Sequence, residues 1–119
     1  MVILQEIKNT NHTFLNGNHM RPPPIYTEIL VCYDVKSDKK RTQLANAIKN
    51  IGLINVQHSV FWGYATSAER KSILTLFPKI LDSKTDKAFI LPGKTREHIL
   101  QGFGYTEQNI PEYSDYAIL

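Results

Sequence analysis

An α+β fold of the ferredoxin-like kind, with the order βαββαβ and an extra C-terminal strand, is predicted by two features of the sequence. Apolar runs typical of strands lie at 26–34, 53–65 and 86–91, and segments with helical periodicity lie at 38–51 and 66–80. In this order both helices cover one face of the sheet. Because no third long helix is available for the other face, we expect a face-to-face homodimer.

The chain divides into three parts. Its 119 residues, 42% of them hydrophobic, are enough for one domain. We expect an N-terminal extension over 1–24, which ends in a polyproline spacer, the ferredoxin-like domain over 25–104, and an acidic tail over 105–119 that frays. The single cysteine, Cys32, excludes an intrachain disulfide and indicates a reducing compartment, so a cytoplasmic location is expected. The apolar start at 2–4 is too short for a signal core or a membrane span.

The segment 26–34 is the strand around which the fold is arranged. Its apolar run, Ile29 to Tyr33, is unbroken, which predicts a strand covered on both faces in the middle of the sheet. Asp34 follows where the backbone must leave the sheet. We therefore expect the chemistry of the protein at this strand end.

The segment 38–51 is predicted to be a helix. Leu44, Ile48 and Ile51 form one apolar stripe, and Gly52 stands where a left-handed C-terminal residue belongs. Ser37 or Asp38 provides the N-terminal cap.

Three cations, Lys39, Lys40 and Arg41, occupy the first turn of this helix, where the dipole disfavours positive charge by up to about 1 kcal/mol. The chain carries a net charge of +3, and its last fifteen residues contain no Lys or Arg, so the body is basic. Two interpretations remain open: the turn binds phosphates of a polyanion, or it is a solvated basic turn.

The following segments are assigned by turn and cap signals. Residues 53–65 form two short strands joined around His58-Ser59, or one bent strand. Thr66 and Glu69 make a capping box that opens the second helix, and Pro78 makes that helix kink or stop near Leu76. Residues 86–91 form another strand, and 96–105 reads as an extended segment, which supplies the extra C-terminal strand.

The sequence resembles the CRISPR-associated Cas-two family, the small partner of the Cas-one spacer integrase. The resemblance rests on Tyr33-Asp34-Val35 at the end of the first strand, and on the run from Gly52 to Phe61, Gly-Leu-Ile-Asn-Val-Gln-His-Ser-Val-Phe. It continues through 89–92 and 96–102, and so covers about residues 26–104.

The resemblance implies a metal-dependent nuclease site. It makes Asp34 the metal-binding acid, facing its copy across the axis of a homodimer whose last strand extends the partner's sheet. Mg²⁺ or Mn²⁺ would be the cofactor, and because Mg²⁺ prefers six oxygens, two aspartates, waters and a phosphate oxygen suit it. Alternatively, Asp34 is only a turn-forming strand end.

Further residues match the family's motifs. Tyr33 either orders water around the metal or packs, and Phe61 either shapes the catalytic site or packs in the core. Among the cations, Arg41 is the first choice for a phosphate contact, because its guanidinium makes two hydrogen bonds at once. Two positions depart from the family: Asn55 replaces a usual arginine, and Trp62 stands where many members have an acid.

The resemblance implies a protein of the spacer-acquisition complex that binds a prespacer DNA duplex, with RNA as a second nucleic-acid partner. It works with the Cas-one integrase, and no membrane is involved. Cleavage of RNA or duplex DNA at the Asp34 pair would be an additional activity. An alternative is a toxin-type ribonuclease of the same fold that acts outside CRISPR. A third hypothesis is a ligand-binding regulatory module of similar topology.

Overall fold

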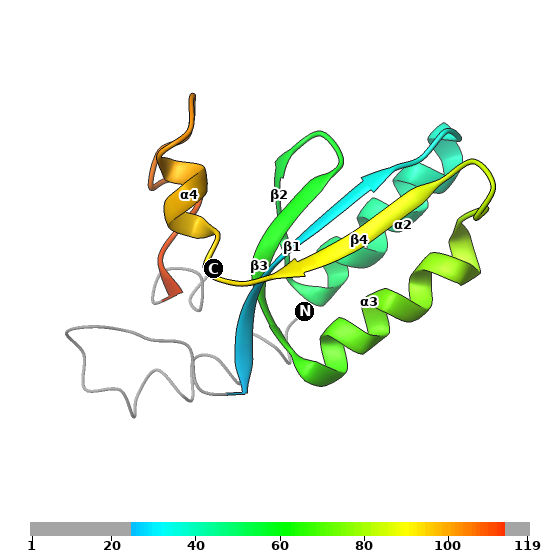
Figure 1. Ribbon diagram of the computed structural model, residues 1–119, viewed down its shortest axis with the longest axis horizontal. Helices are drawn as coiled ribbons and strands as arrows, with labels where there is room; N and C mark the ends of the chain where they lie inside the picture. Colours follow the sequence, from blue (N-terminus) through cyan, green and yellow to red (C-terminus); the bar gives the residue numbers. More distant parts are fainter. Residues whose placement is uncertain (1–24, 114–119) are drawn as a thin grey trace.

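The computed structural model describes residues 25–113 and contains a four-stranded antiparallel sheet (Figure 1). The strands are β1 (Tyr26–Asp34), β2 (Ile54–Gln57), β3 (Val60–Thr66) and β4 (Lys87–Pro92), in the order β2-β3-β1-β4. Helices α2 (Asp38–Ile51) and α3 (Ser67–Ile80) cover one face, and α4 (Arg96–Leu100) lies on the opposite side. The α+β class and the interior position of the first strand are confirmed. Within the described residues no helix is long and apolar enough to cross a membrane.

Helix α2 has the ends that its sequence predicts. The Ser37 hydroxyl oxygen accepts a hydrogen bond from the Lys40 amide at 3.2 Å, which satisfies one of the free N–H groups of the first turn. At the other end, Gly52 adopts the left-handed conformation with φ 112° and donates to the Lys49 carbonyl. Local sequence alone therefore determines the length of this helix.

Helix α3 begins with the predicted capping box. The Glu69 amide donates to the Thr66 hydroxyl oxygen at 3.1 Å, and the Thr66 amide donates to the Glu69 carboxylate at 2.8 Å. The helix continues through Pro78 to Ile80, so it does not stop near Leu76. Pro78 lies in the last turn, where its missing N–H removes one bond at the end of the helix rather than in its middle.

The side chains of β1 alternate between two apolar clusters. Ile29, Val31 and Tyr33 face the helices and pack in one cluster with Leu44, Ile48, Phe61 and Ile73. On the other face, Trp62 and Tyr64 of β3 pack with Tyr26 in a second cluster. Residues 53–65 thus form two strands, one of the two forms expected from the sequence, and β3 contributes to both clusters.

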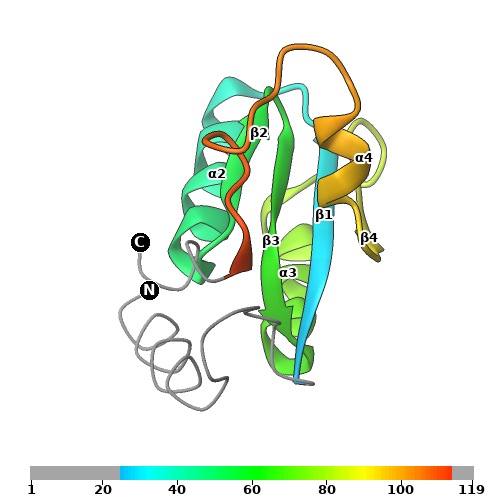
Figure 2. The same ribbon diagram turned by 90° about the vertical axis from the view of Figure 1, so that its left-hand side faces the viewer.

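The expectation that 96–105 is an extended strand, and the chain beyond it a frayed tail, is wrong for the described residues. Residues 96–100 form α4, and Ile110 and Tyr113 are 0% and 2% exposed in the second cluster. In Figure 2 the segment after α4, orange to red, crosses in front of β2. The physical reason is that this segment buries apolar side chains on the sheet face that the helices leave open. Residues 1–24 and 114–119 lie outside the described residues.

Glu28 attaches α4 to the sheet. Its Oε2 atom accepts hydrogen bonds from Trp62 Nε1 at 2.9 Å, from Thr95 Oγ1 at 3.1 Å and from the Arg96 amide. Arg96 Nε in turn donates to the Ile110 carbonyl at 2.9 Å. One carboxylate oxygen therefore joins β1, β3 and the start of α4, and Arg96 extends this connection to the segment that follows.

Replacing Glu28 by alanine should lower the free energy of unfolding by about 1–3 kcal/mol, because three donors lose a charged acceptor. Glu97→Ala removes an exposed acid from α4 itself and should change stability by less than about 0.5 kcal/mol. Urea unfolding checks both values, and amide exchange should show α4 opening faster in the Glu28 variant. Equal effects of the two substitutions would contradict this role of Glu28.

Candidate functional site

Asp34 is an exposed acid at the end of the central strand. Its side chain is 74% exposed and lies 4.0 Å from the Lys36 ammonium, measured from Oδ2 to Nζ. At this exposure the ion pair contributes at most about 1 kcal/mol. The alternation of β1 places Asp34 on the sheet face opposite α2 and α3, beside Lys87, its partner in the register with β4. The carboxylate is thus available to a ligand or to another chain.

Asp86 holds the loop that follows Asp34. It is 7% exposed, and its two carboxylate oxygens accept from the Asp82 amide at 2.9 Å and from the Lys36 amide at 3.0 Å. These backbone hydrogen bonds, that of Asp82 before that of Lys36, lower the pKa of Asp86. The sequence assigns this residue only to the start of a strand, because its partner at Lys36 is fifty positions away.

One chain brings few metal-binding side chains to Asp34. Among residues 25–113, no group of three or more His, Cys, Asp or Glu side chains is placed to hold a metal ion. Mg²⁺, however, is commonly bound through one or two carboxylates and completes its shell with waters and substrate phosphates. The exposed Asp34 carboxylate therefore fits such an ion, either as one carboxylate or as a pair from two chains.

Tyr33 and Phe61, the other two predicted catalytic residues, lie on the helix side of the sheet. Their ring centroids are 6.4 Å apart with the planes at 24°, and Phe61 is fully buried. Burial raises the pKa of the Tyr33 hydroxyl, and the nearby positive charge of Arg41 opposes this shift. Within one chain, the strand period therefore separates both rings from the Asp34 carboxylate, and Phe61 packs in the core.

The three cations of the first turn of α2 do not form one patch. Lys39 is exposed and Lys40 is half-buried, whereas the Arg41 side chain is only 28% exposed. Arg41 donates to the Val35 carbonyl at 3.0 Å and to the Asp38 carboxylate at 2.7 Å. Its guanidinium thus closes the turn between β1 and α2, while Lys39 is the exposed cation of this turn.

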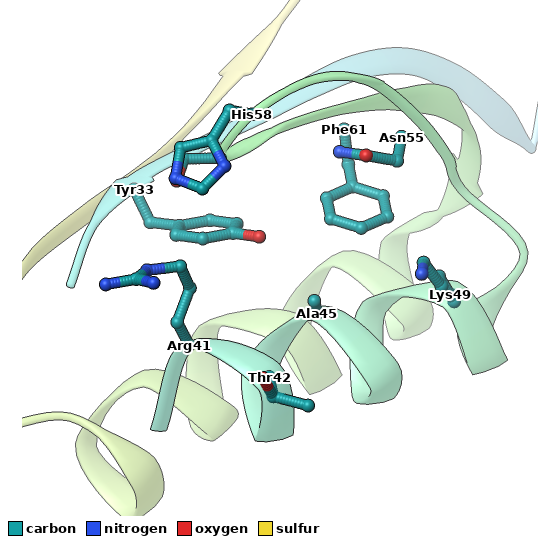
Figure 3. A pocket seen from close by; sticks show the side chains of 9 residues that line it. Tyr33, Arg41, Thr42, Ala45, Lys49, Asn55, His58 and Phe61 are labelled. Carbon is teal, nitrogen blue, oxygen red and sulfur yellow. The ribbon is translucent and has the colours of Figure 1, made fainter. Parts of the chain in front are cut away.

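Arg41 also lines a pocket of about 250 Å³ between α2 and the β2–β3 hairpin (Figure 3). Its other lining residues are Tyr33, Thr42, Ala45, Lys49, Asn55, His58, Ser59 and Phe61. Neither Lys49 nor His58 is predicted as a site residue from the sequence. The spacing of Arg41, Ala45 and Lys49 by four residues along the helix is the signal that places them on one side.

An apolar strip, defined here as Cys32, Phe89 and Leu91, lies on the same face as Asp34. Phe89 is 58% exposed and Leu91 is 48% exposed, and Cys32 lies opposite Phe89 in the register of β1 with β4. Burial raises the pKa of the Cys32 thiol. The part of this face nearer β4 thus presents apolar side chains, whereas the part over β3 is covered by the second cluster.

Comparison with known proteins identifies the family. The model of the family described as CRISPR associated protein Cas2, the Cas-two family of the sequence resemblance, matches residues 27–99. The CRISPR-associated endoribonuclease Cas2 1 of Francisella tularensis subsp. novicida (strain U112) is 37% identical over 91 residues, which are 76% of this chain and 93% of that protein. The corresponding protein of Desulforudis audaxviator (strain MP104C) is 36% identical over 63 residues, 53% of this chain and 59% of that protein. The resemblance seen in the sequence is confirmed.

Solved structures agree with this result. The crystal structure of Streptococcus pyogenes Cas2 at pH 6.5 matches with a TM-score of 0.55 and 31% identity, over 65% of this chain and 99% of that one. A hypothetical protein of Thermus thermophilus matches with a TM-score of 0.52 and 28% identity, over 58% of this chain and 83% of that one.

The lowered pKa of Asp86 predicts a pH dependence of stability. Its folded pKa lies below the unfolded value of about 3.9, so the stability it adds is present above about pH 4 and is lost as the pH falls through the folded pKa. The difference in unfolding free energy between wild type and Asp86→Asn should therefore be largest between about pH 5 and 7 and should shrink in acid. Urea titrations at several pH values measure it, with the exposed Glu107→Gln as the control. A difference that stays constant down to about pH 3 would assign Asp86 no such role.

Proposed function

The chain belongs to the CRISPR-associated protein Cas2 family, and from this premise we propose that it acts as a dimer that binds nucleic acid and cleaves its phosphodiester bonds with a divalent metal ion at Asp34. The observation that carries the proposal is the position of Asp34, exposed at the end of the central strand and next to the apolar strip. The relatives from Francisella and Desulforudis are named endoribonucleases, which supports RNA as a substrate. Duplex DNA is the second substrate class of the proposal.

The apolar strip supports the dimer. Phe89 and Leu91, 58% and 48% exposed, lie on the face that carries Asp34, and a second copy of the same face would remove them from water. In a twofold arrangement that buries this strip, each chain contributes its own Asp34. The dimer would thus supply the second carboxylate that a single chain lacks.

Residues of β1 and of neighbouring segments have different roles in the proposed site. Two Asp34 carboxylates would hold Mg²⁺ or Mn²⁺, and the ion when bound would supply a Lewis acid for attack of water on phosphorus. Lys36, 4.0 Å from Asp34, offers a cation to a substrate phosphate. Tyr33 and Phe61 act as positioning residues: their rings pack against each other, and the Tyr33 amide donates to the Ser59 carbonyl at 3.1 Å, which fixes the end of the strand.

As a member of a CRISPR system, the dimer would also serve spacer acquisition in the cytoplasm. In this role it binds the prespacer duplex and bridges copies of the Cas-one integrase. Lys39, Lys40 and Arg41 would contact phosphates, which the outward position of Lys39 supports. This role needs the cations and the dimer but does not need cleavage.

Replacing Asp34 by alanine should reduce metal-dependent cleavage by at least about 100-fold, because the ion loses its protein ligand. The measurement is a cleavage assay on single-stranded RNA and duplex DNA, with Mg²⁺, with Mn²⁺ and with EDTA. Glu107→Ala, which removes another exposed acid, should leave the rate unchanged. Sedimentation should show the same dimer for all three proteins. Cleavage that survives Asp34→Ala removes this residue from the proposed site.

Replacing Lys39 and Lys40 together by alanine should weaken duplex binding for all sequences alike. Each lost phosphate contact should also reduce the slope of log K against log salt by about 0.9. Arg41 is retained in this variant because its bonds to Val35 and Asp38 close the turn. A variant with the exposed Lys71 and Lys79 of α3 changed to alanine is the matched control. If both variants bind the duplex like the wild type, the first turn of α2 makes no phosphate contact and only faces solvent.

A further inference from the structure

The pocket between α2 and the β2–β3 hairpin is a second polar site, separate from Asp34. It is reached from the helix side of the sheet, whereas Asp34 lies on the opposite face. Figure 3 shows the Tyr33 ring between Arg41 on α2 and His58 on the hairpin, with its hydroxyl directed along the pocket. A phenolic hydroxyl can donate a hydrogen bond to a ligand and accept one from it. Three different elements, β1, α2 and the hairpin, therefore direct polar groups into one space.

The lining is cationic. Arg41 and Lys49 supply positive charge to the lining, and no carboxylate is among its nine residues. Arg41 uses two of its five N–H donors, on Val35 and Asp38, so three remain for a ligand. Asp38 neutralises part of this charge, but its side chain is 93% exposed and therefore well screened by water. A group with several negatively charged oxygens matches such donors better than a neutral one.

The hairpin side of the pocket is fixed in place. The Asn55 amide nitrogen, Nδ2, donates to the carbonyls of Gln57 at 2.9 Å and Val60 at 3.0 Å, which braces the turn from within. Ser59 adopts a left-handed φ of 64°, uncommon for a residue with a side chain, while its carbonyl accepts the Tyr33 amide. The turn is thus held by bonds on both sides in the positive-φ conformation that a two-residue hairpin loop requires.

The size of the pocket limits the ligand. A volume of about 250 Å³ is far larger than the roughly 30 Å³ of one water, and slightly below the about 300–1,000 Å³ of pockets for drug-sized molecules. Ala45 and the ring of Phe61 give part of the wall an apolar surface. A phosphate group with an attached sugar fits this combination of volume, cations and apolar wall.

We propose that this pocket binds a phosphate group carried by a nucleotide or by the end of a nucleic-acid strand, with Arg41 and Lys49 as the charged partners and the Tyr33 hydroxyl as a donor. The proposal does not depend on a metal ion or on Asp34. The binding is therefore expected in EDTA and in the Asp34→Ala variant, so failure of the nuclease proposal and failure of this one are distinguishable.

The experiment is a titration of the full chain in EDTA, in which amide chemical shifts are monitored by NMR. The probes are adenosine 5′-monophosphate, inorganic phosphate, and an oligothymidine with either a 5′-phosphate or a 5′-hydroxyl end. We expect the amides of Thr42 and Ser59 to shift with a phosphate-bearing probe. Lys49→Ala should weaken that binding about fivefold. Lys79→Ala removes the same charge from the last turn of α3 and should leave Kd unchanged.

Comparison of the probes identifies which molecule carries the bound phosphate. Binding of the mononucleotide supports a free nucleotide, and a preference for the 5′-phosphate over the 5′-hydroxyl oligonucleotide supports a strand end. Two results overturn the proposal: no shift at Thr42 and Ser59 with any probe, or equal Kd values for Lys49→Ala and Lys79→Ala. Both variants change exposed helix positions, so loss of folding does not confuse the comparison.

Discussion

The two-residue period of β1 is the constraint on which the rest of the molecule depends. Tyr33 and Asp34 are neighbours in the sequence, yet the pleat directs them to opposite faces of the sheet. Tyr33 joins the cluster under the helices, and Asp34 stays exposed beside Lys87. A register shift of one residue would exchange these positions and bury the carboxylate. The acid and the cationic pocket are therefore separated by the strand itself.

The face opposite the helices is shared between the chain's own C-terminal segment and open surface. Ile110 and Tyr113 cover Trp62 and Tyr64, and the Glu28 carboxylate fixes α4 at the border. What remains open lies along β4, where Phe89 and Leu91 are exposed next to the strand end that carries Asp34. A second chain on this face would thus meet a strip rather than a whole sheet, and any such contact lies close to the acid.

Features set by neighbouring residues could be predicted from the sequence. The ends of α2, the capping box of Thr66 and Glu69 and the interior position of β1 depend on residues within a few positions of one another. Helix α4 could not be predicted in this way, because its first amide, that of Arg96, donates to Glu28, sixty-eight positions away. The same holds for Asp86 and Lys36, and for the pocket, whose walls come from three elements. The orientation of the Arg41 side chain also depends on its hydrogen bond to the Val35 carbonyl, which the sequence alone does not predict.

The short loop after Asp34 connects the Asp34 site with the pocket that Arg41 lines. From one side, Asp86 accepts the Lys36 amide, and from the other, Arg41 donates to the Val35 carbonyl. Arg41 lines the pocket, so a charged group bound through its remaining donors would act on the same guanidinium that holds Val35. Val35 follows Asp34 directly. The position of the acid on one face of the sheet thus depends on a side chain that lines the pocket on the other face.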